Sequence, residues 1–438
     1  MEEVYEKVLI VGADFGTDRE AFERSMKEME SLAKACFMEP VGVVTQRMES
    51  MHKGLYIGPG KVGEVKEAAG LLEAELVIFD DSLTPSQLRN LQKELEKPVM
   101  DRTALILDIF ERRARTREAR LQVESAKLKY LLPRLVGMHG AMTRQGGTSG
   151  SMSSRGAGEK KLELDRRRIE HRIAELSREL KAVSRERKVQ RQKREGDRIP
   201  LVALVGYTNA GKSTIMNAML DAYMQREEKK VLEKDMLFAT LDTTVRRINT
   251  GNNKDFLLSD TVGFIHKLPH DLVEAFHSTL EEVENADLLL HVVDYSDSHY
   301  REQAKTTRET LQKLNAGAIP AITVYNKSDK CGEEAVYPRR VGEDKIYISA
   351  KDESSLKMLT EMILERVYED YLSAEFLIPY DKGQLISYFS QKAHVLSRKY
   401  EEEGIGLKVR CHKADKEKYA KYLRTPEQEN GVGGISRR

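Results

Sequence analysis

The residue pattern with the most specific chemistry lies in residues 201–213, LVALVGYTNAGKS. Gly206 and Gly211 stand in the G-x-x-x-x-G-K-[ST] phosphate-loop spacing, between a strand-like apolar run and a helix expected over Ser213–Leu220. Backbone N–H groups of such a loop surround phosphate oxygens at a helix N-terminus, which favours anions. We expect Lys212 to reach the β- and γ-phosphates and Ser213 to bind Mg²⁺. The residues predicted to surround the phosphates are Gly206, Tyr207, Thr208, Asn209, Ala210, Gly211, Lys212, Ser213 and Thr214.

Two later motifs predict which base is bound. The first, Asn326, Lys327, Ser328 and Asp329, follows a strand expected over Ile322–Tyr325. The Asp329 carboxylate would accept hydrogen bonds from guanine N1–H and N2–H₂, and adenine offers no such pair. The second, Ser349, Ala350 and Lys351, follows a strand expected over 345–348 and would line the base from the other side. The base is therefore predicted to be guanine, which argues against an ATPase.

Two segments between these motifs are candidates for the Mg²⁺ site and the γ-phosphate sensor. Asp260, Thr261, Val262 and Gly263 end the apolar run 256–258, where Asp260 would hold Mg²⁺ through water and the Gly263 N–H would meet the γ-phosphate. Thr240 is expected to add its hydroxyl to Mg²⁺ when that phosphate is present. It lies within Phe238, Ala239, Thr240, Leu241 and Asp242. We predict metal ligation by Ser213, Thr240 and Asp260, and catalytic roles for Lys212, Thr240 and Gly263.

Two side chains affect the expected rate of hydrolysis and the ions that the site could bind. Phe264 stands where many GTPases place a glutamine that orients the attacking water. This predicts slow intrinsic hydrolysis, raised when a partner orders the switch segments or supplies a group. Asn209 leaves two interpretations open: its oxygen helps to hold K⁺ beside the phosphates, or it makes a hydrogen bond within the loop.

The elements that precede this domain alternate between strand-like and helix-like patterns over residues 1–110. Strands are expected over 8–11, 41–46, 76–79 and 98–101, and helices over 18–35, 61–72 and 85–95. This alternation predicts a small parallel-sheet α/β domain. Its turn Gly58–Gly63 is interpreted as structural rather than as a phosphate site, and a second nucleotide site in this domain remains an open question.

Residues 111–198 predict a basic two-helix hairpin. Lys and Arg outnumber Asp and Glu by 8 to 3 over 111–135 and by 15 to 9 over 159–198, and apolar residues in both stretches recur at helical spacing. A solvated helix face and contact with a polyanion both explain this charge. Between the helices, residues 137–158 hold seven glycines and predict a loop, either an RNA-probing tip or a plain linker.

The remaining expectations concern the C-terminal half and the class of the protein. Residues 199–372 are assigned to the nucleotide domain and 373–438 to a small α/β domain with a strand at 376–378, a helix at 384–403, a strand at 405–410 and a flexible tail. The three cysteines show no C-x-x-C spacing, no stretch of 18 apolar residues occurs, and Lys and Arg (72) balance Asp and Glu (71). A monomeric, soluble cytoplasmic protein without a membrane span is expected.

The whole chain resembles the HflX family of the Obg–HflX group of GTPases. The resemblance rests on GYTNAGKS at 206–213, FATLD at 238–242, DTVGF at 260–264 and NKSD at 326–329, together with 115–135, 154–169 and the 58–61 turn. It implies an N-terminal α/β domain, a two-helix linker, a Mg²⁺-dependent GTPase domain and a small C-terminal domain. It also implies binding to the 50S ribosomal subunit and, as in well-studied members, splitting of stalled ribosomes under stress.

The sequence departs from the family pattern at three places. The departure beside Asp242 predicts a looser first switch segment, and the two in the hairpin loop and its exit concern contact with the ribosome rather than GTP binding. Thr243 stands where the family usually has proline, Ala157 replaces the proline of G-P-G, and Lys160 and Lys161 fall in a run that is usually E-T-x-L-E-T-D-like. Ribosome dissociation or rescue is the leading functional hypothesis. The alternatives are a GTP-dependent 50S assembly factor and a GTP-switched regulator that binds a protein.

Overall fold

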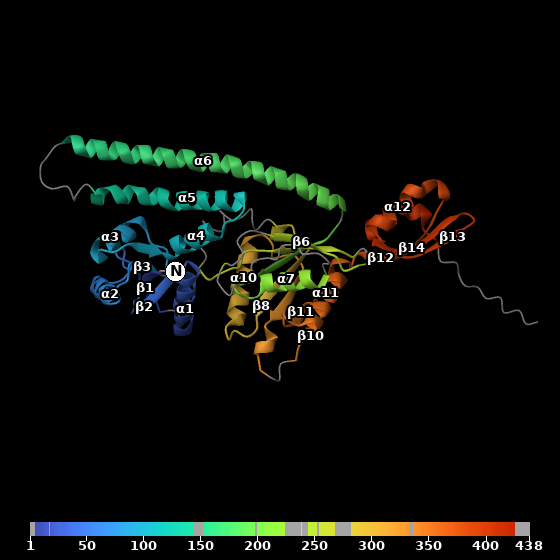
Figure 1. Cartoon of the computed structure of the whole chain (residues 1–438), viewed down its shortest axis with the longest axis horizontal. Coiled ribbons are helices and arrows are strands. Elements are labelled where there is room, and N and C mark those ends of the chain that lie inside the picture. Colours follow the sequence, from blue (N-terminus) through green and yellow to red (C-terminus); the bar gives the residue numbers. More distant parts are fainter. Residues whose placement is uncertain are drawn as a thin grey trace, which may run out of the picture.

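The computed structural model describes residues 5–16, 18–142, 152–197, 199–223, 238, 244–251, 254–267, 282–332 and 336–424. These residues form three sheets, which follow one another in chain order along the molecule, and a long helical hairpin that lies beside the first two (Figure 1). The predicted mixed α/β architecture, with its N-terminal parallel sheet, is confirmed. Among the described residues, no helix combines the length and apolarity needed to span a bilayer.

The N-terminal domain is a parallel sheet with strand order β2-β1-β3-β4. Alternate residues of β1 pack on opposite faces, with Val8 and Ile10 in one core and Leu9 and Val11 in the other, as expected for a central parallel strand. Pro85 opens α3 behind a Thr84–Gln87 capping box. The elements are β1 (Glu6–Asp14), α1 (Arg19–Ala35), β2 (Met38–Arg47), α2 (Pro59–Leu71), β3 (Leu76–Phe79), α3 (Pro85–Leu95), β4 (Val99–Asp101) and α4 (Arg102–Arg113).

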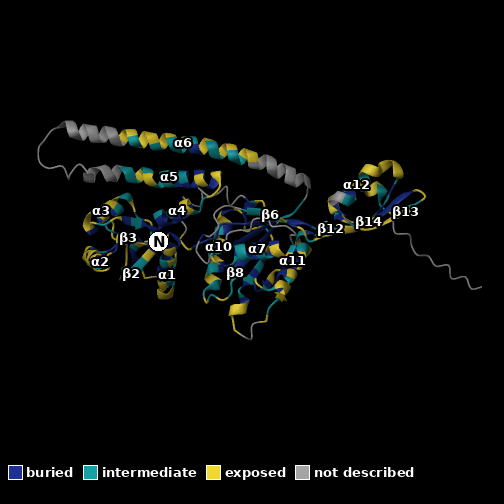
Figure 2. Ribbon diagram, viewed as in Figure 1, coloured by how far each residue is buried: buried dark blue, intermediate teal, exposed yellow. Residues whose placement is uncertain are grey.

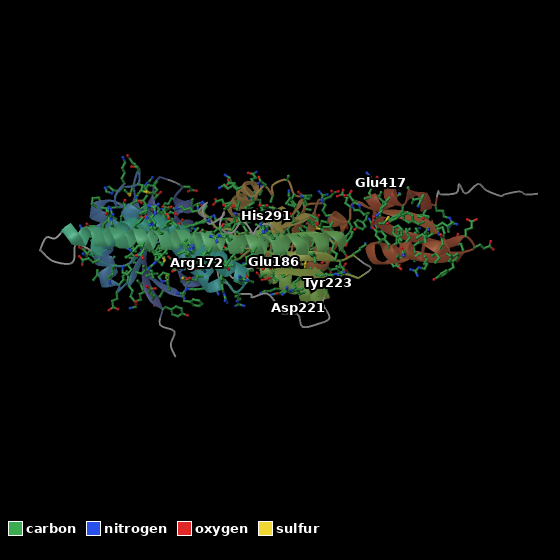
Figure 3. All side chains as sticks on the ribbon, turned by 90° about the horizontal axis from the view of Figure 1, so that it is seen from above. Arg172, Glu186, Asp221, Tyr223, His291 and Glu417 are labelled. Atoms are coloured by element: carbon green, nitrogen blue, oxygen red, sulfur yellow. The ribbon has the colours of Figure 1, made fainter. Side chains whose placement is uncertain are left out.

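The hairpin consists of α5 (Arg117–Met142) and α6 (Met152–Asp197). Figures 1 and 3 show α6 extending along both the N-terminal domain and the GTPase domain. Several of its basic groups are paired, since Arg172 bonds to Glu124 of α5 at 2.7 Å and Arg166 pairs with Glu170 at 2.9 Å.

The glycine-rich connection in the hairpin is shorter than the loop expected over 137–158. Helix α5 continues to Met142 and α6 begins at Met152, so both ends of that stretch are helical. A glycine inside a helix costs only about 1 kcal/mol relative to alanine, and an already nucleated helix extends readily. Residues 143–151 lie outside the described part of the chain.

The GTPase domain is a seven-stranded sheet with the order β10-β11-β9-β8-β5-β7-β6. Its five inner strands are parallel, whereas β6 and β10 are antiparallel edges. The elements are β5 (Leu201–Gly206), α7 (Lys212–Tyr223), β6 (Thr244–Ile248), β7 (Phe256–Asp260), β8 (Leu288–Asp294), α10 (Tyr300–Lys313), β9 (Ala321–Asn326), η1 (Ser328–Lys330), β10 (Arg339–Val341), β11 (Lys345–Tyr347) and α11 (Glu353–Val367).

The C-terminal domain is an antiparallel sheet of order β12-β14-β13. The helix expected over 384–403 is wrong in its second half, because α12 ends at Lys392 and β13 follows. There the chain pairs with β14 across the turn before Gly404, and cross-strand pairing overrides the local helical preference. The elements are β12 (Tyr371–Ile378), η2 (Tyr380–Lys382), α12 (Gly383–Lys392), β13 (His394–Glu401), β14 (Gly404–His412), α13 (Lys413–Lys418) and η3 (Ala420–Tyr422).

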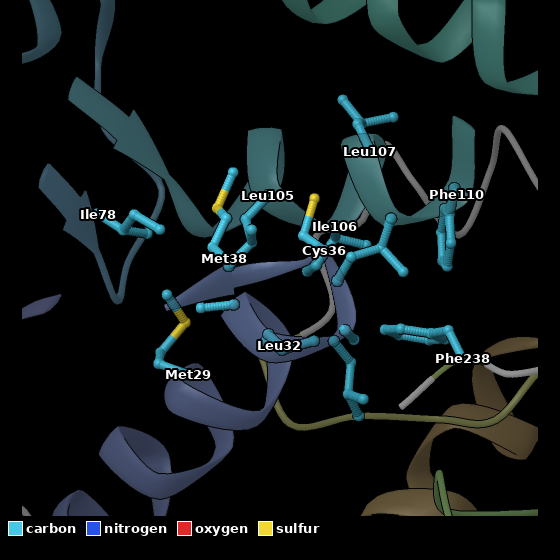
Figure 4. Close-up of a cluster of buried hydrophobic side chains, with 14 of the residues drawn as sticks. Met29, Leu32, Cys36, Met38, Ile78, Leu105, Ile106, Leu107, Phe110 and Phe238 are labelled. Carbon is cyan, nitrogen blue, oxygen red and sulfur yellow. The ribbon is translucent and has the colours of Figure 1, made fainter. Parts of the chain in front are cut away.

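One buried core joins the N-terminal domain to the GTPase domain. Residues of α1, α4 and α5 share it with Phe238 and Val262, which belong to the two segments predicted to respond to the γ-phosphate, and with Ile265 just beyond the second segment (Figure 4). The Phe238 ring lies edge-on to Phe110 of α4 at a centroid distance of 4.8 Å. Figure 2 shows buried residues in α4, on the N-terminal side of this junction.

Candidate functional site

The phosphate loop connects β5 to α7 in a conformation that requires glycine at both ends. A Cβ on Gly206 would lie 2.2 Å from the backbone oxygen of Val292. Gly211 has φ +94°, and a Cβ there would lie 2.2 Å from Nδ2 of Asn326. The glycine spacing recognised in the sequence therefore has a steric cause in the fold.

The Lys212 ammonium lies inside this loop. Its side chain is 7% exposed, and Nζ donates to the backbone oxygens of Gly206 at 3.1 Å and Tyr207 at 2.8 Å. Burial lowers the pKa of Lys212 to about 8, and the negative charge of Asp260 opposes that shift. Among the residues that the structure describes, this buried cation contacts backbone carbonyls and forms no ion pair, and a phosphate would supply the anionic partner.

The two predicted metal ligands in the described chain lie together. The Ser213 hydroxyl donates to Oδ2 of Asp260 at 2.7 Å, although 47 residues separate them. The neighbouring Thr261 hydroxyl donates to Leu204 O at 2.6 Å and fixes the end of β7 beside the loop. A hydroxyl beside a buried carboxylate is an oxygen donor set of the kind that Mg²⁺ prefers, so these residues fit the predicted ion.

Gly263 packs directly against the phosphate loop. A Cβ at this position would lie 2.7 Å from Cγ2 of Thr208 and 3.1 Å from Nζ of Lys212. The next residue, Phe264, bonds through its backbone to Gly206 O at 3.1 Å and to Thr208 N at 2.9 Å. Its ring is 2% exposed and belongs to the core beneath α10. In this structure the residue at the glutamine position is thus a packing group.

The predicted base-recognition segments are tied to the phosphate loop by Asn326. Its Nδ2 donates to Ala210 O at 3.0 Å, and its Oδ1 accepts from the Ala350 N–H at 3.0 Å. Lys327 Nζ donates to Asn209 O at 2.8 Å and to Asp294 Oδ2 at 2.7 Å. One amide and one ammonium therefore fix three separate segments at the same edge of the sheet.

The remaining residues of both base motifs lie at the same edge. The Ser328 N–H donates to Ile348 O at 3.1 Å, and the Lys351 N–H donates to the Ser349 hydroxyl at 3.4 Å. Asp329 and Lys351 are exposed. These side chains therefore stand where a ligand from solvent can reach them.

The first switch segment is described only at Phe238. This residue is buried in the core of the N-terminal domain. The predicted metal ligand Thr240, with Ala239, Leu241, Asp242 and the departure Thr243, lies outside the described residues.

A polar network that the sequence did not predict joins the N-terminal domain to residues 261–267, which we call the switch II segment. Arg102, at the start of α4, donates to Asp80 at 2.6 Å and to His266 O at 2.9 Å, and also pairs with Glu28. Burial pulls the pKa of Arg102 down, but the Glu28 and Asp80 carboxylates outweigh it and raise the pKa overall. Lys267 donates to Asp80 at 2.8 Å and to Asp81 at 2.7 Å.

The phosphate loop itself joins this network through Tyr207. The Tyr207 hydroxyl donates to Glu28 of α1 and accepts from the His266 N–H at 2.8 Å. Burial, followed by the Glu28 charge, raises the pKa of Tyr207, which keeps the hydroxyl protonated as a donor. The available sequence signal was the acidic pair Asp80-Asp81 directly after a buried strand.

Three family models match consecutive parts of the chain. A model described as "GTP-binding GTPase N-terminal" matches residues 23–111, one described as "GTP-binding GTPase Middle Region" matches 113–194, and one described as "50S ribosome-binding GTPase" matches 201–327. A solved structure titled "crystal structure of SsGBP and GDP complex" aligns with a TM-score of 0.45 and 24% identity, over 83% of this chain and 99% of that one.

Curated relatives named "GTPase HflX" match over nearly the full length. The relative from Caldanaerobacter subterraneus subsp. tengcongensis is 43% identical over 403 residues, covering 92% of this chain and 90% of that one. The relative from Escherichia coli K12 is 38% identical over 409 residues, covering 92% and 93%. With the phosphate loop, the Asn326 bridge and this similarity together, the chain belongs to the HflX family of GTPases.

Proposed function

We propose that this GTPase binds the large (50S) ribosomal subunit in its GTP form and dissociates or rescues stalled ribosomes. The observation that carries the nucleotide site is the Asn326 bridge, which joins the phosphate loop to both base-recognition segments. The ribosomal partner is supported by the family description that matches residues 201–327 and by the local basic excess of the hairpin helices.

Each predicted site residue has a role in this proposal. The loop N–H groups and Lys212 bind the phosphates, and Gly263 presents its N–H to the γ-phosphate. Asp329 accepts hydrogen bonds from the guanine edge, and residues 349–351 line the base. GTP is hydrolysed to GDP and phosphate.

Mg²⁺ would be held by Ser213, Asp260 through water, and Thr240. The Ser213–Asp260 contact at 2.7 Å supports this assignment, and Thr240 enters on sequence grounds alone. When bound, the ion neutralises charge on the phosphate oxygens. We also propose that Asn209 helps to hold K⁺, which predicts faster hydrolysis in KCl than in NaCl; equal rates would remove K⁺ from the mechanism.

Slow intrinsic hydrolysis has two structural supports. The Phe264 ring is in the core and has no hydrogen-bonding group to orient a water. The switch II segment is also held by Arg102 and Lys267 contacts to the N-terminal domain, and Phe238 of the first switch is buried there. A partner that displaces the N-terminal domain from these segments would free them to close on the nucleotide.

The test is cosedimentation of the full chain with purified 50S subunits and, separately, with 50S precursors. The incubations contain GDP or a non-hydrolysable GTP analogue, at 50 and 200 mM KCl. We expect analogue-dependent binding to mature 50S that weakens at the higher salt. Preferential binding to precursors would select the assembly role. Absence of binding to any particle would select a switch that acts on a protein.

A further inference from the structure

Among the residues that the structure describes, no helix covers one face of the GTPase sheet near the predicted guanine site. The inner face of β9 and β11 packs against α7 and α11 through Ile322, Val324 and Ile346. On the opposite face, α10 packs against β5 and β8. Within the described chain, the connection from β9 to β11 holds only η1 and the edge strand β10. Figure 1 shows this region at the side of the domain away from α6.

Four tyrosines cover this face instead. The rings of Tyr325 and Tyr347, on neighbouring parallel strands, stack at 4.6 Å with an interplanar angle of 17°. Tyr295 lies edge-on to Tyr347 at 5.0 Å and to Tyr300 at 5.2 Å. All four side chains are partly exposed. We call them the tyrosine platform.

Arginines add positive charge to the platform. The guanidinium of Arg339 lies 4.6 Å from the centre of the Tyr347 ring, so Tyr325, Tyr347 and Arg339 form three successive layers. Arg301 lies 5.7 Å from the centre of the Tyr300 ring. Both arginines are exposed, and neither pairs with a carboxylate of the described residues.

The acidic group next to Tyr295 is already neutralised by a cation. Asp294, which precedes the platform on β8, is already paired with Lys327 at 2.7 Å. Arg308 of α10 is a further cation whose charge acts on Tyr325. The ring cluster alone would only shield the sheet from water, but the arginines around it select an anionic, stacking ligand.

We propose that the tyrosine platform binds an unpaired base of an RNA strand together with its adjoining phosphate. A flipped-out base stacks on aromatic rings and on guanidinium planes, whereas a duplex hides those base faces. A guanidinium held flat on a ring retains outward N–H donors for the phosphate. This surface contacts the RNA partner of the proposed function. Only the identification of that RNA as ribosomal rests on the proposed function.

The test compares two neighbouring arginines on one strand. Arg339→Gln removes the outer layer of the stack, while Arg340→Gln removes the same charge from a residue that instead pairs with Glu365 at 2.6 Å. Binding of a fluorescent 12-nucleotide single-stranded RNA and of a duplex of the same sequence is measured by anisotropy with the full chain. We expect Arg339→Gln to weaken single-strand binding about fivefold and Arg340→Gln to change it less than twofold. Equal effects of the two variants on single-strand binding would overturn the proposal.

Crosslinking gives a second readout that does not depend on the variants. The same strand carrying 4-thiouridine is irradiated with the wild-type chain, and the modified peptides are mapped. We expect modification of peptides that contain Tyr300 or Tyr347. Crosslinks confined to the hairpin helices would overturn the proposal. The proposal would also be overturned if a protein partner covered the platform and RNA binding persisted unchanged.

These results separate the inference from the proposed function. If Arg339→Gln weakens binding of the RNA strand but the wild-type chain binds no ribosomal particle, the platform stands and the ribosomal role fails. If 50S binding occurs and Arg339→Gln alters neither it nor strand binding, the ribosomal role stands and the platform fails.

Discussion

Replacing Lys267 tests most sharply whether the N-terminal domain restrains the switch II segment. Its ammonium donates to Asp80 at 2.8 Å and to Asp81 at 2.7 Å, both in the N-terminal domain. Hydrogen bonds to charged groups contribute about 1.5–3 kcal/mol. The Lys267 side chain is 34% exposed, so solvent screening places the expected loss near the lower limit, about 1.5 kcal/mol. Asp80 keeps its bonds to Arg102 and Ser25, which limits the damage to the core.

If release of the switch II segment limits the resting reaction, Lys267→Met should hydrolyse GTP about tenfold faster without ribosomes, because about 1.4 kcal/mol corresponds to a factor of ten. The assay is single-turnover hydrolysis by the full chain with Mg²⁺. Lys305→Met is the matched control, since among the described residues the ion pair of Lys305 is with Glu309 of its own helix, at 4.0 Å. A Lys267→Met rate within twofold of both wild type and control, in a folded protein, would refute the restraint.

Three further predictions concern the nucleotide site. Asp329→Asn should lower GTP affinity at least tenfold in calorimetry, because an amide replaces one acceptor oxygen facing the guanine edge; unchanged affinity would reject guanine recognition by this residue. Gly263→Ala should slow single-turnover hydrolysis more than tenfold while GDP affinity changes less than threefold, since the added Cβ would crowd Thr208 and Lys212; retained hydrolysis would show that the segment can shift. Lys212, with a pKa near 8, is charged below that pH and neutral above it, so GTP affinity should fall from pH 7.5 to 9. GTP binding near pH 8.5 should also take up a proton, which calorimetry in buffers of different ionisation enthalpy measures. Absence of proton uptake would place the pKa of Lys212 in the free protein well above 9.

Local sequence signals predicted the elements that hold the nucleotide site because the site lies where strands end. The expected strand at 322–325 is β9 (Ala321–Asn326), and the helix expected at 213–220 is α7 (Lys212–Tyr223). In a parallel sheet the carboxyl ends of strands meet at one edge, so motifs at those ends converge. The Asn326 bridge follows from this rule.

Interactions between distant segments explain what the sequence could not reveal. The segment 394–401 has residues that suit a helix, and only its pairing with β14 makes it a strand. Helix α4 was not predicted because the basic residues of its last turn resemble the composition of the hairpin that follows. Its apolar face packs into the core of the N-terminal domain. The hydrogen bonds of the Arg102 network join residues up to 187 positions apart, and no spacing rule anticipates such contacts.

The central claim, a ribosome-dependent GTPase with restrained switches, is tested most directly by steady-state GTP hydrolysis with and without purified 50S subunits, in KCl buffer with Mg²⁺. The account predicts a slow rate alone and at least a tenfold increase with 50S subunits, with a smaller relative increase for Lys267→Met because its restraint is already weakened. A fast rate for the isolated chain would contradict the restraint. A slow rate that 50S subunits leave unchanged, with GTP still bound, would contradict the ribosomal partner.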